Sequence, residues 1–273
     1  MSTIRIIVVG DTHGDARENL SVRSIQRATQ FGAEAVIQCG DFGLWDHNLA
    51  GIEFLDVLNE SARKADIPFV WLDGNHENHD RLAWYVKNNP KNKHGMTYIR
   101  SHILYSPRGN HWEWDNKRFM TVGGAVSIDK ESRLYYETHS DKYGPRTLWW
   151  PGEALTDAQA DGIVANMNSR RAAGKPGVDY LFTHDCSDRT PFHSRLKPDL
   201  DSTLNRKRID KILEATQPTM HFHGHMHTWY EWENRVANYY TNTYGLECDG
   251  MFSSWGLLDT NTNKFEFTPK KEK

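Results

Sequence analysis

The sequence contains few cysteines, no long apolar run and no large excess of charge of one sign. Its three cysteines, Cys39, Cys186 and Cys248, are widely spaced in 273 residues, which argues against a disulfide framework and predicts a reducing, cytoplasmic location. The apolar run at 6–9 is much shorter than the roughly 20 residues of a membrane span or the about 7–15 residues of a secretory signal, so we expect no membrane partner. A net charge of −3, from 33 basic and 36 acidic residues, does not favour binding to a long nucleic acid.

The residues that are present predict a folded α/β protein. An aromatic content of 12% provides enough apolar surface for a core. Over the first 90 residues, β-branched runs predict strands at 4–9, 33–38 and 68–72, and apolar residues at helical spacing predict helices at 16–31, 48–65 and 79–88. Strands that alternate with helices indicate parallel strands joined by right-handed crossovers.

The rest of the chain is expected to complete a single domain over residues 1–273. Residues 90–155 are less regular and rich in tryptophan, and we interpret them as an irregular insert or cap-like region with one strand at 118–127. Beyond them we expect helices at 157–173 (capped by Thr156) and 203–216 (capped by Ser202), and strands at 178–183, 220–223, 238–244, 253–258 and 264–267. The predicted fold class is therefore α/β, with two packed mixed β-sheets flanked by helices.

Five of the predicted strands are followed by residue types that bind metal ions. These residues are Gly10-Asp11-Thr12-His13, Gly40-Asp41, Gly74-Asn75-His76-Glu77, His184 and Gly224-His225-Met226-His227. Because ligands of open α/β sheets collect beyond the carboxyl ends of the strands, we expect these residues to converge. Carboxylate, imidazole and amide donors without a thiolate suit Mn²⁺, Fe or Zn²⁺. The number of donors exceeds what one tetrahedral ion needs, which favours two ions that share a carboxylate.

The order of these motifs resembles the calcineurin-like metallophosphoesterase superfamily, and the segments 149–151 and 180–185 resemble a bacterial and phage subgroup of it. The resemblance implies two divalent ions, with Mn²⁺ expected first and Fe, Zn²⁺ or Ni²⁺ as alternatives. It implies that Asp11, His13 and His227 hold one ion, that Asn75, His184 and His225 hold the other, and that Asp41 bridges them. It also implies that a bridging hydroxide attacks the phosphorus in line while His76 assists the leaving group.

The residues after the second motif bear on the substrate class. Ser/Thr phosphatases of this superfamily continue Gly-Asp with a Val-Asp-Arg-Gly-type run, whereas here Gly40-Asp41 continues as Phe42-Gly43-Leu44-Trp45. Without an arginine at that place a dianionic monoester loses a bidentate partner. We therefore favour a small phosphodiester or cyclic nucleotide, with Trp45 near a nucleoside. The alternatives are a phosphomonoesterase or protein phosphatase, a nuclease, and a non-catalytic scaffold.

Two further histidines, His221 and His223, lie within the strand predicted before Gly224. We interpret them as sheet residues that could support the ligands from behind rather than as ligands themselves.

Overall fold

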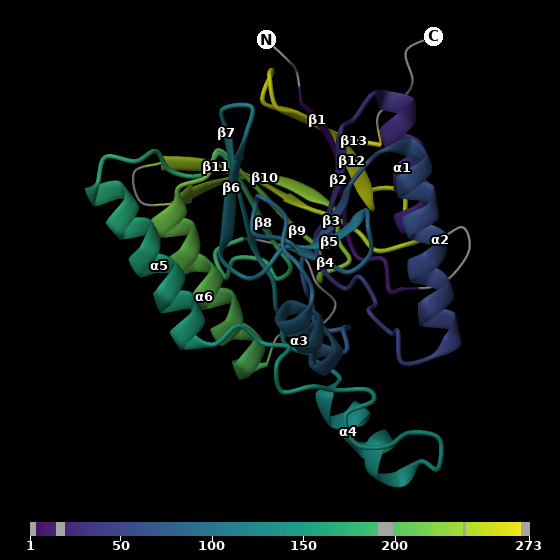
Figure 1. The fold of residues 1–273 in the computed structure, drawn as a ribbon. Coiled ribbons are helices and arrows are strands. Elements are labelled where there is room, and N and C mark those ends of the chain that lie inside the picture. The colour runs from purple at the N-terminus through teal and green to yellow at the C-terminus, as the bar shows by residue number, and fades with distance from the viewer. Residues whose placement is uncertain (1–3, 15–19, 191–198, 237–238, 269–273) are drawn as a thin grey trace.

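The strands of the protein form two mixed β-sheets. The computed structural model describes residues 4–14, 20–190, 199–236 and 239–268. The seven-stranded sheet has the order β13-β12-β1-β2-β3-β5-β4, and the six-stranded sheet has the order β10-β11-β9-β8-β7-β6 (Figure 1). The first sheet comprises β1 (Arg5–Val9), β2 (Ala35–Gln38), β3 (Phe69–Trp71), β4 (Thr97–Tyr98), β5 (Ile103–Tyr105), β12 (Trp255–Asp259) and β13 (Lys264–Phe267). The second comprises β6 (Asn110–Trp114), β7 (Lys117–Val122), β8 (Tyr180–Thr183), β9 (Met220–His223), β10 (Tyr230–Val236) and β11 (Tyr239–Gly245).

Each sheet has a parallel centre and antiparallel edges. Strands β1, β2, β3 and β5 are parallel neighbours in one sheet, and β7, β8, β9 and β11 are parallel neighbours in the other. Strand β12 pairs antiparallel with both β1 and β13, and the β12–β13 pair confirms the hairpin expected near the C-terminal end. The parallel centres direct the carboxyl ends of several strands to one rim of the molecule.

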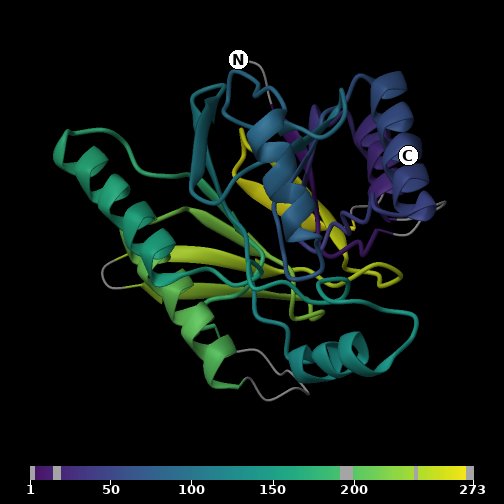
Figure 2. The ribbon, with the colours of Figure 1, turned by 60° about the horizontal axis from the view of Figure 1, so that its bottom comes forward.

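Two pairs of helices cover the outer faces of the two sheets. The helices of the described residues are α1 (Leu20–Phe31), α2 (Leu49–Ala65), α3 (His79–Asn88), α4 (Lys130–His139), α5 (Asp157–Ala172) and α6 (Leu200–Thr216). Figure 1 shows α1 and α2 on one side of the sheets and α5 and α6 on the other, and Figure 2 shows α4 apart from both pairs. In the described ranges, no helix combines the length and apolar character that a membrane crossing requires.

Side-chain alternation along the strands separates three apolar clusters. In β1, Ile7 and Val9 pack in the cluster that includes α1 and α2, while Ile6 and Val8 pack between the two sheets. The third cluster joins the six-stranded sheet to α5 and α6, through residues such as Leu181. Since successive side chains of a strand point to opposite faces, a strand buried on both sides is apolar throughout. The expected arrangement of two mixed sheets flanked by helices is confirmed.

Several local expectations need correction. Helix α6 begins at Leu200, and its N-cap is Asp199, whose side chain accepts a hydrogen bond from the Ser202 backbone N–H, so the expected cap at Ser202 is wrong. The expected cap at Thr156 is confirmed. Residues 16–19 of one expected helix and residue 238 of one expected strand lie outside the described residues.

The region 90–155 is more regular than its sequence indicates. It provides β4 and β5 to one sheet and β6 and β7 to the other, and the segment that follows β7 contains α4. In Figures 1 and 2, α4 lies beyond the ends of the strands, on the side of the molecule where α3 is also found in Figure 1.

Candidate metal centre

Loops at the carboxyl ends of strands from both sheets meet around Asp41. Asp11, Asp41 and Asn75 follow β1, β2 and β3, while His184 and His225 follow β8 and β9. Crossovers between parallel strands bring these carboxyl ends to a common rim, which explains how residues more than 200 positions apart become neighbours. The structure therefore brings together the residues that were expected to converge.

The Asp41 carboxylate occupies the centre of the cluster and is almost completely buried. Its Oδ1 accepts hydrogen bonds from the backbone N–H groups of Asn75 and His76, both at 2.8 Å, and lies 3.2 Å from His184 Nε2. Its Oδ2 lies 3.6 Å from His13 Nε2 and 3.9 Å from His76 Nε2. Thus one oxygen is fixed by the backbone while both oxygens face imidazoles from different loops.

Asp11 organises the other side of the cluster. His227 Nε2 lies 2.9 Å from Asp11 Oδ2, and the His225 backbone N–H donates to both carboxylate oxygens at 3.0 and 3.1 Å. The His13 ring lies between the two halves, with its centroid 5.1 Å from that of His76 and 5.3 Å from that of His227. Asp11 belongs to the seven-stranded side and His227 to the six-stranded side, so this contact joins the two sheets.

A chain of hydrogen bonds orients the Asn75 amide. Its Nδ2 donates to Ser127 Oγ at 3.1 Å, and Ser127 donates in turn to the buried Glu153 at 2.6 Å. This arrangement leaves Asn75 Oδ1 3.2 Å from His184 Nε2, and His184 is held from its other side by a 2.7 Å contact between Nδ1 and the Cys39 carbonyl. The amide oxygen and the imidazole nitrogen consequently face the same point.

The backbone of the site is conformationally strained. Four candidate ligands have left-handed backbones, with φ of 50° at His13, 52° at Asp41, 62° at His225 and 45° at His227. Non-glycine residues rarely adopt this conformation, and such strain is typical of functional sites. The surrounding structure must impose it, because the side chains themselves do not favour it.

Glycines allow the loops to approach each other closely. A Cβ atom at Gly74 would lie 2.2 Å from Asp41 Oδ1, and one at Gly224 would lie 2.0 Å from Asp11 Oδ1. Any side chain at either position would displace a central carboxylate, so glycine is required there.

The carboxylates and imidazoles of the cluster shift one another's pKa values. Burial alone would raise the pKa of Asp41, but the neighbouring His184 and His76 hold it well below the ordinary value. Burial would lower the pKa of His184, whereas Asp41 raises it to about 10. The hydrogen bond to Asp11 raises the pKa of His227, also to about 10. In the metal-free protein, protonated imidazoles therefore balance the two carboxylates.

The donor set fits metal ions. Three groups of side chains have potential ligand atoms within 4.8 Å of one another: Asp11, His13 and His227; His13, Asp41 and His76; and Asp41, His184 and His225. Imidazole and carboxylate donors suit Mn²⁺, Fe and Zn²⁺, and the protonated imidazoles lose their protons when they bind an ion. Since Asp41 belongs to two of the groups and His13 to two, the geometry can accommodate adjacent ions that share a carboxylate.

Two residues of the site have roles that the sequence did not reveal. Glu77 is fully buried and accepts hydrogen bonds from the backbone N–H groups of Phe42 at 2.6 Å and Gly74 at 2.7 Å, so it ties the Asp41 loop to the Asn75 loop. Burial raises the pKa of Glu77, and Asp41 raises it further. Arg133 of α4 reaches His76 from the segment after β7, with Nη2 2.7 Å from His76 Nε2. Of these two residues, only Glu77 could have been suspected from the sequence, because it belongs to the Gly-Asn-His-Glu motif.

The two histidines of β9 are fully buried, and their hydrogen bonds go to residues other than the candidate ligands. His221 Nε2 lies 2.7 Å from Thr183 Oγ1, and His223 contacts the Gly224 carbonyl and the Tyr230 hydroxyl. Burial lowers the pKa of both, to about 4 for His223, so both are neutral sheet residues. His223 fixes the backbone just before His225 and can support it indirectly.

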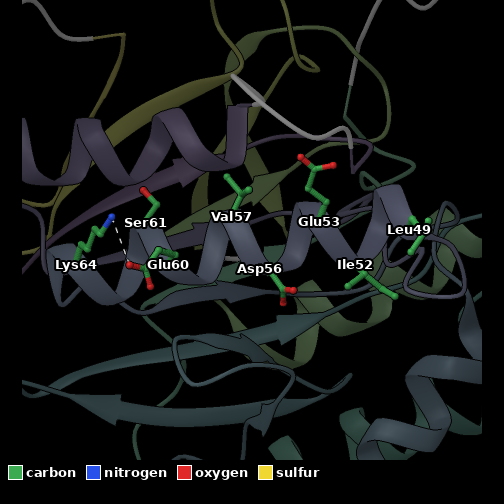
Figure 3. Close-up of a pocket in the computed structure, with 8 residues that line it drawn as sticks. All are labelled: Leu49, Ile52, Glu53, Asp56, Val57, Glu60, Ser61 and Lys64. Atoms are coloured by element: carbon green, nitrogen blue, oxygen red, sulfur yellow. Dashed lines mark ion pairs between the residues drawn. The ribbon is translucent and has the colours of Figure 1, made fainter.

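A broad hollow of about 810 Å³ lies elsewhere, on the outer surface of α2 (Figure 3). Its lining residues all belong to that helix and include Leu49, Ile52, Glu60 and Lys64, the last two of which form an ion pair at 3.4 Å. None of the candidate ligands contributes to it. A single helix face without converging polar groups provides no chemistry comparable to that around Asp41.

Comparisons with known proteins agree with this geometry. The family model of calcineurin-like phosphoesterases matches residues 4–229. Among solved structures, a dimetal phosphatase from Danio rerio aligns over 93% of this chain and 91% of its own, with 13% identity and a TM-score of 0.52. GAP50, described as the anchor in the inner membrane complex of Plasmodium, aligns over 100% and 87%, with 14% identity and a TM-score of 0.51. At these identities the structural matches establish the fold alone, and no curated protein matches the chain.

Proposed function

Since this chain belongs to the calcineurin-like phosphoesterase family, we propose that it is a metal-dependent hydrolase that cleaves phosphodiester bonds, with a small or cyclic nucleotide as substrate. The observation that carries the proposal is the convergence of imidazoles on the buried Asp41 carboxylate from loops of both sheets. A structural role alone would not require so many titratable groups to be buried against one another, because their burial is costly without ions.

The ligands divide into two sets around Asp41. One ion would be held by Asp11, His13 and His227, the other by Asn75, His184 and His225, and Asp41 would contact both. Mn²⁺ is the first expectation, with Fe, Zn²⁺ and Ni²⁺ as alternatives that the same donors accept. When bound, such ions offset the negative charge of a phosphate ester and activate water for attack on it.

His76 is the residue we assign to the leaving group. Its ring faces the cluster, and its Nε2 lies 3.9 Å from Asp41 Oδ2 and 2.7 Å from Arg133 Nη2. Burial lowers the pKa of His76, and Arg133 lowers it further, although Asp41 opposes both. Because a guanidinium only donates, Nε2 accepts an Arg133 N–H in this arrangement. Once a ligand takes over that contact, a protonated His76 could donate to an oxygen that develops negative charge, which is worth roughly 10²–10⁴-fold in rate.

The preference for a diester rests on the residues after Asp41. Phe42 and Leu44 are completely buried there, so neither offers a polar group to a dianionic monoester. Trp45 is partly exposed and packs against the buried Trp150, with the ring centroids 5.5 Å apart, so the loop that follows Asp41 presents one supported aromatic ring. A monoanionic diester with a nucleoside matches these features.

A reconstitution screen tests the proposal. Metal-free protein would be loaded with Mn²⁺, Fe²⁺, Zn²⁺, Ni²⁺ or Mg²⁺ and assayed against bis-p-nitrophenyl phosphate, cyclic nucleotides, p-nitrophenyl phosphate, phosphopeptides and DNA. We expect metal-dependent cleavage of the diesters, which Asp41→Asn abolishes. Preference for p-nitrophenyl phosphate or phosphopeptides would instead identify a phosphomonoesterase. Salt-dependent cleavage of DNA would identify a nuclease, and no hydrolysis with any ion would favour a scaffold.

A further inference from the structure

Arg133 is a buried cation that enters the site from outside the ligand-bearing loops. It belongs to α4, and only 9% of its surface is exposed. Its Nη2 lies 2.7 Å from His76 Nε2 although the two residues are 57 positions apart. The guanidinium therefore donates a hydrogen bond to the imidazole that we assign to the leaving group.

Contacts within the segment after β7 fix the orientation of this side chain. Arg133 Nε forms an ion pair with Asp129 Oδ1 at 2.8 Å, and Nη1 donates to the Leu148 carbonyl at 3.3 Å. The Leu148 backbone is itself held by Glu137 of the same helix, which accepts its N–H at 2.7 Å. A guanidinium restrained in this way loses little freedom when it binds a ligand.

The hydrogen-bonding capacity of Arg133 is only partly used. A guanidinium has five N–H groups, and the hydrogen bonds to Leu148 and His76 engage one on each terminal nitrogen, while Nε forms the ion pair with Asp129. Within the described part of the chain, one N–H on each terminal nitrogen thus remains for a ligand. Two parallel N–H groups match two oxygens of a phosphate, which is the geometry that arginine recognises best.

We propose that Arg133 is a substrate-binding residue that donates hydrogen bonds to the non-bridging oxygens of the phosphoryl group from the side opposite Asp41. This rests on the proposed function, since it assumes that the phosphoryl group lies between the ligands and His76. A monoanionic diester also presents two non-bridging oxygens, so this contact is compatible with the proposed substrate class, and the segment after β7 forms part of the substrate site. The ligand class is an anionic tetrahedral phosphate, whether free or esterified.

Binding of inorganic phosphate to the Mn²⁺-loaded protein tests this assignment without requiring turnover. Isothermal titration calorimetry would compare the wild type with Arg133→Met, Arg133→Lys and Arg146→Met. Arg146 is a matched control, because it lies in the same segment but is 57% exposed and pairs with Asp80 at 3.1 Å. We expect Arg133→Met to weaken phosphate binding by roughly 10- to 100-fold, Arg133→Lys to weaken it less, and Arg146→Met to leave it unchanged. Bound manganese should be the same in all four proteins.

The outcomes separate this inference from the proposed function. If Arg133→Met and Arg133→Lys bind phosphate as tightly as the wild type, even with a lowered Tm, Arg133 only anchors α4 and the assignment is wrong. A wild type that binds no phosphate would also contradict it. If the wild type binds phosphate through Arg133 but hydrolyses no ester, the binding assignment stands and the proposed function fails.

Discussion

Two substitutions of Asp41 distinguish the effect of its charge from the effect of its hydrogen bonds. Asp41→Asn keeps an oxygen that can accept the backbone N–H groups of Asn75 and His76, which lie 2.8 Å from Oδ1, but it removes the charge. Asp41→Ala removes both. We therefore expect the two variants to share a defect in metal binding and to differ in stability.

The magnitudes follow from these contacts. Asp41→Ala leaves two buried N–H groups without an acceptor, at about 1–3 kcal/mol each, so the free energy of unfolding should fall by roughly 2–6 kcal/mol. At these two hydrogen bonds Asp41→Asn should cost only about 1 kcal/mol, because neutral hydrogen bonds replace charge-assisted ones. Both variants also lose the ion pair with the buried His184, so the difference between their stabilities measures the hydrogen bonds. Loss of an outer hydrogen-bond partner of a ligand typically weakens metal binding by about 10–100-fold, and loss of a shared carboxylate should weaken it more than that.

The assay combines metal titration with urea denaturation of the metal-free proteins. Asp46→Asn is a matched control, since Asp46 lies in the same loop but pairs with Arg81 at 2.6 Å rather than with the cluster. We expect Asp46→Asn to bind two ions as the wild type does. Two ions bound to Asp41→Asn with wild-type affinity would refute the shared-ligand assignment, and equal stability of Asp41→Asn and Asp41→Ala would refute the hydrogen-bond argument.

Three further predictions concern residues around the cluster. His76→Ala should retain both ions in elemental analysis while diester turnover falls by roughly 10²–10⁴-fold; loss of an ion would make His76 a ligand instead. Burial alone would raise the pKa of Asp46, but hydrogen bonds from Arg81 and Tyr85 lower it below the unfolded value. The wild type should therefore be about 1 kcal/mol more stable than Asp46→Asn at pH 7, an advantage that thermal melts should find lost as the pH falls below about 4. Arg108→Met leaves Asp73, its partner at 2.6 Å, charged and buried, and chemical denaturation should reveal a loss of about 3–5 kcal/mol; an unchanged midpoint would contradict this.

The core strands and the candidate ligands could be predicted because their signals are local. The apolar run of β1 is buried on both faces, and the residues that bind metals follow directly at its carboxyl end. The same reasoning applies to β2, β3, β8 and β9. In each case a short strand that is largely apolar, interrupted in β9 by His221 and His223, leads into a loop with glycine or polar residues, so the pattern locates both the element and its loop.

The elements that were missed have weaker or different local patterns. Strand β10 forms an edge of its sheet, and its sequence alternates aromatic and polar residues, with Trp232 substantially exposed. Strands β4 and β5 have only 2 and 3 residues, too few for any periodicity to be recognised. Helix α4 carries few apolar residues, and its most informative member, Arg133, is buried through contacts with distant residues.

The N-cap of α6 illustrates the same limit on a smaller scale. Asp199 and Ser202 are both good capping residues, and sequence alone does not decide between them. Leu200 is apolar but 73% exposed, so the first turn of α6 does not bury its apolar residue as an amphipathic pattern would predict. Tertiary packing determines at which residue such a helix begins, whereas the sequence only indicates a range of a few residues.

The contact between Asp11 and His227 crosses from one sheet to the other, and the same is true of Asn75 and His184. An ion held by either pair would link the two sheets, because the sheets could not separate on unfolding without releasing the ion. Each tenfold rise of free ion above its dissociation constant would then add about 1.4 kcal/mol against unfolding. Resistance to proteolysis should therefore increase with the concentration of free metal ion, and when the ion is scarce the protein should be degraded faster.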